Sequence, residues 1–251
     1  MIITVANQKG GVGKTDLAAN LSSCLAKNGK KVLLMDLDPQ ANATTYITDK
    51  KHRKTTSHLL LDGKMKICDI AVKTKVENLY LAPSSQHLYA TQIELLNDVG
   101  MQFKLKKKLS EGHDFDYIVI DTPPSLGLLT INALTASTHV IVPVQTNYFA
   151  LDGMEMLLKT VDRIKEEINP GLDLRGFVLT MYDKRSKLSG EIENIVRGKF
   201  GKKVMETNIP VNVDLAISPK MHEPIIISNK ESRGAHAYVN LAEEIINLEG
   251  N

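Results

Sequence analysis

A glycine-rich turn near the start of the chain carries the residue types that bind phosphate. Residues 7–15 read Asn-Gln-Lys-Gly-Gly-Val-Gly-Lys-Thr and lie between the apolar run of residues 2–6 and a helical pattern. A strand that breaks into glycines and then a helix places backbone N–H groups around one point, where an anion is favoured. We expect Gly10, Gly11 and Gly13 to be required, because a Cβ atom would block the turn and the approach of phosphate.

The side chains of this turn extend the prediction from phosphate to a nucleotide with its metal. Lys14 brings a positive charge to the β- and γ-phosphates, and the Thr15 hydroxyl is placed to ligate Mg²⁺. The general phosphate-loop pattern has glycine five residues before its last glycine, where this chain has Gln8. Lys9, a second lysine beside the glycines, is the informative departure. The turn therefore predicts a nucleotide with β- and γ-phosphates together with Mg²⁺.

Aspartates follow two further apolar runs. Residues 32–35 read Val-Leu-Leu-Met, which is typical of a strand covered on both faces, and they lead to Asp36 and Asp38. Residues 117–120 end at Asp121, whose carboxylate we expect to hold Mg²⁺, usually through a water. Ligands bind at the carboxyl ends of the strands in a doubly wound sheet. We therefore expect these carboxylates near the phosphate turn.

The composition fits one large domain. At 251 residues the chain can bury a substantial core, and nothing in it demands two domains, so we assign residues 1–251 to one domain. A net charge of +2 permits contact with nucleic acid without arguing for it. Cys24 and Cys68 show no metal-binding or disulfide pattern. Since the sequence has neither a charged leader nor an apolar run of about 18 residues, we expect a cytoplasmic protein.

Apolar runs and helical patterns alternate along most of the chain. Residues 79–82, 140–144 and 176–181 are typical of further strands. We expect a helix from Ser84–Ser85 to about Ser110, and a short strand and turn over residues 204–210. Signals between residues 48 and 75 are weak. The alternation predicts an α/β fold, a single doubly wound and mostly parallel sheet with helices on both faces.

Residues 9–15, Lys-Gly-Gly-Val-Gly-Lys-Thr, are similar to the deviant Walker A motif of the ParA/MinD group of ATPases. Taken with residues 36–44, 121–124, 181–183 and 210–215, they resemble a ParA/Soj-type partition ATPase over nearly the whole chain. The resemblance implies a P-loop NTPase that hydrolyses ATP weakly when alone. It also implies an ATP-dependent homodimer that binds nonspecific DNA and is released when a ParB-type partner stimulates hydrolysis. Such a protein is associated with the nucleoid when DNA binding holds.

The resemblance also assigns roles to individual residues. Lys9 is expected to reach across the dimer to the partner's nucleotide, and Asp38, in the switch I region, to orient or activate the attacking water. Residues 121–124 form switch II, and Pro210 and Asn212 are expected to contact the adenine. The expected catalytic residues are Lys9, Lys14 and Asp38, and the metal ligands Thr15 and Asp121. The expected nucleotide contacts are Lys9, Gly10, Gly11, Val12, Gly13, Lys14, Thr15, Asp16, Pro210 and Asn212.

Asp16 departs from the family, which usually has a second hydroxyl here, in contact with the α-phosphate. A carboxylate about 5 Å from a phosphate charge costs roughly 1 to 3 kcal/mol. Its place in the first turn of a helix returns about 0.3 to 1 kcal/mol. We therefore expect weakened but not abolished nucleotide binding. The alternative is that Asp16 points away to cap the helix and does not meet the nucleotide.

A second departure concerns the DNA-binding face, where relatives commonly carry arginines, an acid and a glycine. This chain has Val211, Asp214, Ile217 and His222 there. The basic residues that could compensate are Arg197, Lys199, Lys202, Lys203 and Lys220. DNA binding would therefore depend on these basic residues.

Other classes of protein share the phosphate turn. A MinD-like membrane ATPase needs a basic amphipathic helix near its C-terminus, and nothing after Arg233 is basic, so we expect no stable membrane association. A nitrogenase-reductase-like electron carrier needs cluster-ligating cysteines, which Cys24 and Cys68 do not supply. A positioning ATPase of the same fold that does not bind DNA stays open as the alternative.

Overall fold

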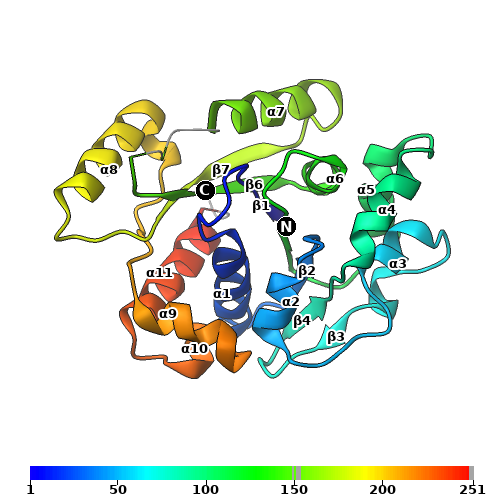
Figure 1. Cartoon of the computed structure of the whole chain (residues 1–251), viewed down its shortest axis with the longest axis horizontal. Helices are drawn as coiled ribbons and strands as arrows, with labels where there is room; N and C mark the ends of the chain where they lie inside the picture. The colour runs from blue at the N-terminus through cyan, green and yellow to red at the C-terminus, as the bar shows by residue number, and fades with distance from the viewer. Residues whose placement is uncertain (149, 151–153, 249–251) are drawn as a thin grey trace.

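The computed structural model describes residues 1–148, 150 and 154–248. Within this part, seven strands form one sheet in the order β3-β4-β2-β5-β1-β6-β7 (Figure 1). The strands are β1 (Ile2–Val5), β2 (Val32–Asp36), β3 (Val72–Lys73), β4 (Leu79–Ala82), β5 (Tyr117–Asp121), β6 (His139–Gln145) and β7 (Asp173–Thr180). All neighbours run parallel except β3, which pairs antiparallel with β4. The predicted fold class is confirmed.

The helices are α1 (Lys14–Lys27), α2 (Asn42–Ile47), α3 (Thr56–Leu61), α4 (His87–Leu95), α5 (Lys104–Ser110), α6 (Leu128–Ala136), α7 (Met154–Glu167), α8 (Lys187–Phe200), α9 (Val213–Ile217), α10 (Ile225–Ser228) and α11 (Arg233–Asn247). Short 3₁₀ turns are η1 (Ile67–Asp69), η2 (Met101–Phe103), η3 (Gly201–Lys203) and η4 (Ser218–Met221). The helices cover both faces of the sheet, so the strands require apolar side chains on both sides.

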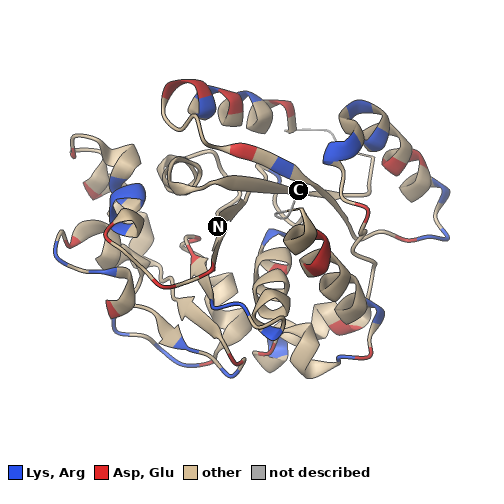
Figure 2. Cartoon of the chain, turned by 180° about the vertical axis from the view of Figure 1, so that it is seen from behind, with Lys and Arg blue, Asp and Glu red and all other residues tan. Residues whose placement is uncertain are grey.

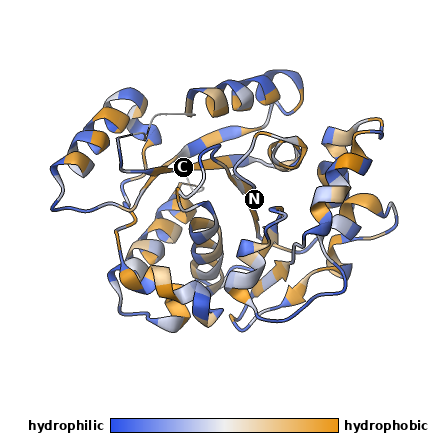
Figure 3. Cartoon of the chain, in the orientation of Figure 1, coloured by the Kyte–Doolittle hydropathy of each residue, from blue (hydrophilic) through white to orange (hydrophobic). Residues whose placement is uncertain are grey.

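Alternate residues of each central strand enter different cores. Val32 and Leu34 of β2 pack with α1, α2 and α11 on one face, whereas Leu33 and Met35 pack with α3, α4, α5 and α6 on the other. Beyond β1, strands β6 and β7 pack with α7 and α8 in a third cluster. Figure 3 shows the apolar colouring concentrated on the strands and on one side of the helices. Continuous apolar runs in the sequence arise from this two-sided burial.

The parallel register brings the predicted carboxylates to one edge of the sheet. Asp121 lies opposite Val5 of β1 and opposite Asp36 of β2. The phosphate turn leaves β1 at the same edge and leads into α1. Three segments far apart in the sequence therefore meet where β1, β2 and β5 end.

Several local predictions were wrong. The helix expected from residue 84 to about 110 is broken into α4, η2 and α5, with Gly100 between them at a left-handed φ of 71°. Residues 204–210 form only isolated bridges, Val204 with Phe177 and Pro210 with Tyr182. The weak region from 48 to 75 contains α3, η1 and the edge strand β3. At the first two places, tertiary packing decides between short segments that sequence patterns do not separate, whereas no element had been predicted for residues 48–75.

Among the helices of the described residues, none combines the length and the apolar character that crossing a bilayer requires.

Candidate nucleotide-binding site

The backbone conformation of the phosphate turn requires glycine at only some of its glycine positions. Gly11 and Gly13 have φ values of 73° and 84°, a left-handed conformation that disfavours residues with a Cβ. Gly10 does not have a left-handed φ, and a Cβ built on it meets no atom of the described residues, apart from its chain neighbours, within 4 Å. The turn alone therefore does not explain Gly10. Close approach of a phosphate remains its predicted reason.

The two lysines of the turn point to different neighbours. Lys14 is buried, and its Nζ donates to the carbonyl of Lys9 at 2.9 Å. Burial lowers the pKa of Lys14, against the attraction of Asp121 and Asp38. Lys9 Nζ instead donates to Asn147 Oδ1 at 3.2 Å, in the segment after β6. Thus the Lys14 side chain stays inside the phosphate turn, whereas the Lys9 side chain reaches out of the turn to the segment after β6.

Thr15 and Asp121 meet at the edge of the sheet. Thr15 Oγ1 donates to Asp121 Oδ2 at 2.8 Å, and Asp121 Oδ1 is buried with no hydrogen-bond partner among the described residues. Burial, and then the negative charge of Asp36, raise the pKa of Asp121 well above its usual range. A buried carboxylate oxygen without a donor is what a hydrated cation would satisfy. This pair fits Mg²⁺.

The two aspartates after β2 have separate surroundings. Asp36 Oδ2 accepts from the backbone N–H and the hydroxyl of Thr44, at 2.7 and 2.8 Å, and Asp36 Oδ1 accepts from Asp38 N. Burial raises the pKa of Asp36 to about 7, against these hydrogen bonds. Asp36 therefore shapes the loop, whereas Asp38 lines the large cavity beside the phosphate turn. The resemblance implied a catalytic role for Asp38 and none for Asp36, and the role of Asp38 stays a prediction.

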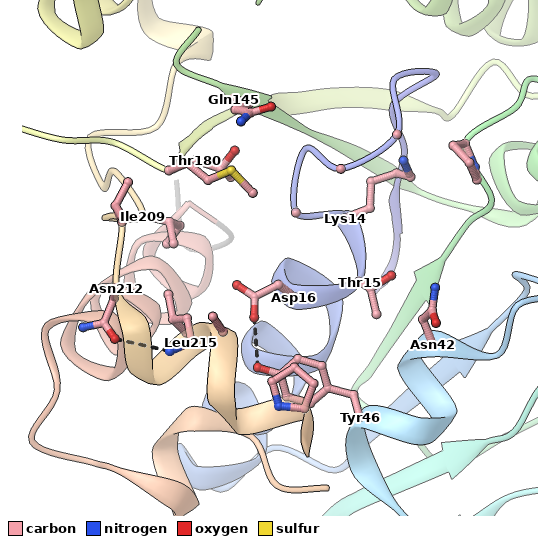
Figure 4. Close-up of a pocket in the computed structure, with 18 of the residues that line it drawn as sticks. Lys14, Thr15, Asp16, Asn42, Tyr46, Gln145, Thr180, Ile209, Asn212 and Leu215 are labelled. Atoms are coloured by element: carbon pink, nitrogen blue, oxygen red, sulfur yellow. Dashed lines mark hydrogen bonds between the residues drawn. The ribbon is translucent and has the colours of Figure 1, made fainter. Parts of the chain in front are cut away.

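A cavity of about 860 Å³ extends from the phosphate turn toward the C-terminal helices (Figure 4). Its walls include Gly10, Gly11, Gly13, Lys14, Thr15, Asp16, Asp38, Asn42, Tyr46, Thr180, Pro210, Asn212 and Leu215. Pro210 and Asn212 thus lie on the wall where the adenine was predicted. Asn212 Oδ1 is already used as the N-cap of α9, accepting from Asp214 N and Leu215 N. Only its amide nitrogen is left to contact a base.

Asp16 lines the same cavity, but its carboxylate is held within the protein. Its oxygens accept from Tyr46 and Tyr238 hydroxyls and from Asn20 Nδ2, at 2.9, 2.6 and 3.0 Å. Burial raises the pKa of Asp16, against these three hydrogen bonds. The side chain is turned toward protein donors, but it does not cap α1, which has no side-chain cap hydrogen bond among the described residues. The weakening of nucleotide binding stays a prediction. No sequence pattern singled out Tyr46, Tyr238 or Asn20.

Replacement of Asp121 is expected to weaken the binding of Mg²⁺ and not only the binding of the nucleotide. We predict that Asp121→Asn lowers the apparent affinity for Mg²⁺ by about 10- to 100-fold, the usual effect of losing an outer-shell carboxylate. The measurement is a Mg²⁺ titration of ADP binding by calorimetry. Asp116→Asn, at the opposite end of β5, is the control. Equal Mg²⁺ dependence in Asp121→Asn and the wild type would contradict the assignment.

The strand, phosphate turn and helix, with the paired Thr15 and Asp121, define a P-loop nucleotide-binding protein. The AAA domain model matches residues 1–174. Chromosome partitioning protein ParA of Caulobacter vibrioides is 40% identical over 252 residues, covering 99% of this chain and 94% of the relative. Soj of Bacillus subtilis, the sporulation initiation inhibitor protein, is 44% identical over 246 residues, 97% of each chain.

A solved structure supports the same class of protein. Cobyrinic acid a,c-diamide synthase from Mycobacterium smegmatis, with bound ADP and magnesium, superposes with a TM-score of 0.88 at 32% identity. The superposition covers all of this chain and 95% of the synthase chain. Given these relatives over its full length, the chain belongs to the ParA/Soj family of P-loop ATPases.

Proposed function

We propose that this chain is an ATP-dependent partition ATPase that dimerises on ATP, binds nonspecific DNA and is stimulated by a ParB-type partner. The observation that carries the proposal is the presence of two lysines in one phosphate turn, of which Lys14 lies within it and Lys9 extends from it. One phosphate cradle within a chain needs one such lysine. We infer that the second, Lys9, serves a nucleotide held by another copy of the chain.

The proposed reaction divides the work among a few residues. Lys14 and the backbone N–H groups of the phosphate turn bind the phosphates, and Thr15 and Asp121 hold Mg²⁺. When bound, Mg²⁺ neutralises charge on the phosphates during transfer. Asp38 orients the attacking water, and Lys9 of a second copy adds positive charge at the same phosphates. The rate is expected to be low until a partner completes or orders this arrangement.

The candidate DNA-binding surface has fewer available cations than its sequence indicates. Arg197 donates to Glu193 Oε1 at 2.9 Å and to the Met205 carbonyl at 3.0 Å, and Lys203 pairs with Asp173. Lys202 and Lys220 are exposed, and neither forms an ion pair in the part of the chain that the structure describes. Figure 2 shows Lys and Arg along α8 and the turn after it. Lys202 and Lys220 are our candidates for contacts with DNA phosphates.

The test is fluorescence anisotropy of a short duplex of arbitrary sequence, titrated at several salt concentrations with and without Mg²⁺ and ATP. We expect binding only with ATP, weakening steeply as salt increases. The double variant Lys202→Ala/Lys220→Ala should reduce the salt slope by about 2, since each phosphate-contacting lysine contributes about 1. Lys50→Ala/Lys51→Ala is the matched control. ATP-induced dimers that bind no DNA would instead identify a positioning ATPase, expected in the cytoplasm without the nucleoid.

A further inference from the structure

Asp16 joins three parts of the fold through one carboxylate. Oδ1 accepts from Tyr46 of α2 and from Asn20 of α1, and Oδ2 accepts from Tyr238 of α11 at 2.6 Å. Figure 4 shows the Asp16 side chain turned toward Tyr46. Tyr46, Tyr238 and Asn20 are each at most 3% exposed. A buried carboxylate with all its donors supplied holds those donors in one arrangement, because each lost bond leaves a buried polar group unpaired.

The donors connect the phosphate turn to regions that lie outside that turn. Tyr46 comes two residues after Thr44, which binds Asp36 at the start of switch I. Asn20 Oδ1 accepts from the backbone N–H of Ile225, the first residue of α10. A second contact between the same regions joins the Thr45 carbonyl to His222 Nδ1 at 2.6 Å. The hydrogen bonds thus link α1 to α2, α10 and α11.

Asp16 is also the residue directly after Thr15, in the first turn of the helix that begins at the phosphate turn. A shift of this turn on nucleotide binding therefore moves the carboxylate that Tyr46 and Tyr238 bind. Packed side chains and hydrogen bonds with discrete arrangements carry such a shift between sites. This is a physical path from the phosphates to the C-terminal helices.

We propose that Asp16, Tyr46 and Tyr238 are positioning residues that make α1, α2 and the C-terminal helices α10 and α11 respond to the nucleotide as one unit. The inference deepens the proposed function and rests on its nucleotide site. Asp16 stands where relatives usually have a hydroxyl, and in this chain its carboxylate takes a positioning role through Tyr46 and Tyr238. The network holds switch I in place for hydrolysis, and it transmits nucleotide binding to the surface formed by the C-terminal helices.

Amide hydrogen exchange with and without ATP and Mg²⁺ tests the proposal. In the wild type we expect ATP to slow exchange in residues 9–16, 42–47 and 225–240. In Tyr238→Phe, residues 9–16 should keep their protection, while the ATP-dependent protection of 233–240 falls by about fivefold, the population change that one hydrogen bond represents. Nucleotide affinity should stay within about twofold of the wild type, with kcat lower by about fivefold.

Two further variants make the outcome decisive. Tyr80→Phe, on β4 and packed against Phe115, is the matched control and should leave the exchange pattern unchanged. If Tyr238→Phe does not fold, Tyr46→Phe should uncouple residues 42–47 while 233–240 stay protected. A direct route also exists, because Leu215 of the cavity wall packs closely against Gly234. Full protection of 233–240 in Tyr238→Phe would show that this route suffices and would overturn the proposal.

The same data separate this proposal from the function on which it rests. Absence of ATP protection at residues 9–16 in the wild type would contradict the nucleotide site itself. Protection at 9–16 without any at 225–240 would leave the nucleotide site intact and overturn only the positioning role.

Discussion

Asp38→Ala is expected to bind ATP and remain a dimer while losing turnover by about 100-fold or more, the usual contribution of a positioned acid or base. The physical reason is that Asp38 lies on the cavity wall with one carboxylate oxygen held by the Gln40 N–H, whereas both oxygens of Asp36 accept from Thr44 and from the Asp38 backbone. Removing the Asp38 carboxylate leaves the phosphate turn and its lysines in place. Phosphate release measured against ATP concentration gives kcat, and calorimetry gives the affinity.

The matched control is Asp49→Ala, an exposed aspartate shortly after α2. It should hydrolyse ATP at the wild-type rate. Asp38→Ala turnover at the wild-type rate would remove Asp38 from the reaction. A parallel loss of affinity and turnover would show that Asp38 shapes the turn and does not act on water.

Lys9→Ala is expected to lose ATP-dependent dimerisation and to reduce turnover by about 100-fold, while a single chain still binds nucleotide. We place the loss below that of an arginine finger, because lysine contributes a point charge and not a bidentate fork. Within one chain, Lys9 Nζ contacts Asn147. Lys14 Nζ bonds the backbone carbonyl of Lys9, which alanine keeps, so the Lys14 contact stays intact in Lys9→Ala. Sedimentation velocity with and without ATP measures the assembly.

Lys27→Ala, at the exposed end of α1, is the control for loss of one lysine charge. It should sediment as the wild type does at each ATP concentration. An ATP-induced dimer of Lys9→Ala with unchanged stability would exclude Lys9 from the interface between copies.

The sequence predicted the class of site because its parts are local and their order is fixed. A β-branched strand, three glycines, Lys14 and Thr15 occur within one continuous segment, and the two-sided apolar strands predict where their ends meet. The pairing of Asp121 with Asp36 across β5 and β2 follows from that topology. These properties depend on short-range pattern and a known sheet rule.

Contacts between distant residues were not predictable in the same way. Asp16 and Tyr238 are 222 residues apart, and no local pattern marks a tyrosine hydroxyl as the donor to a carboxylate. The break near Gly100 depends on how α4 and α5 each pack, although both halves carry a helical pattern. The expectation that Asp16 lies near a phosphate came from the family resemblance, and the donors that hold Asp16 became visible only in three dimensions.

The most direct test of the account concerns whether Lys9 acts in the site of the partner copy. The measurement is ATP hydrolysis by a mixture of Lys9→Ala and Asp38→Ala chains, each nearly inactive by itself. In a mixed dimer, the chain with Lys9→Ala keeps its own Asp38 and receives an intact Lys9 from the other copy. We predict that activity returns toward an upper limit of about a quarter of the wild-type rate, which random pairing would give because half of the dimers would be mixed and one of their two sites complete. The weaker dimerisation of the Lys9→Ala chain places the observed rate below this limit. If Lys9 acts within its own chain, no site in the mixture is complete, and a mixture as inactive as its components would contradict the account.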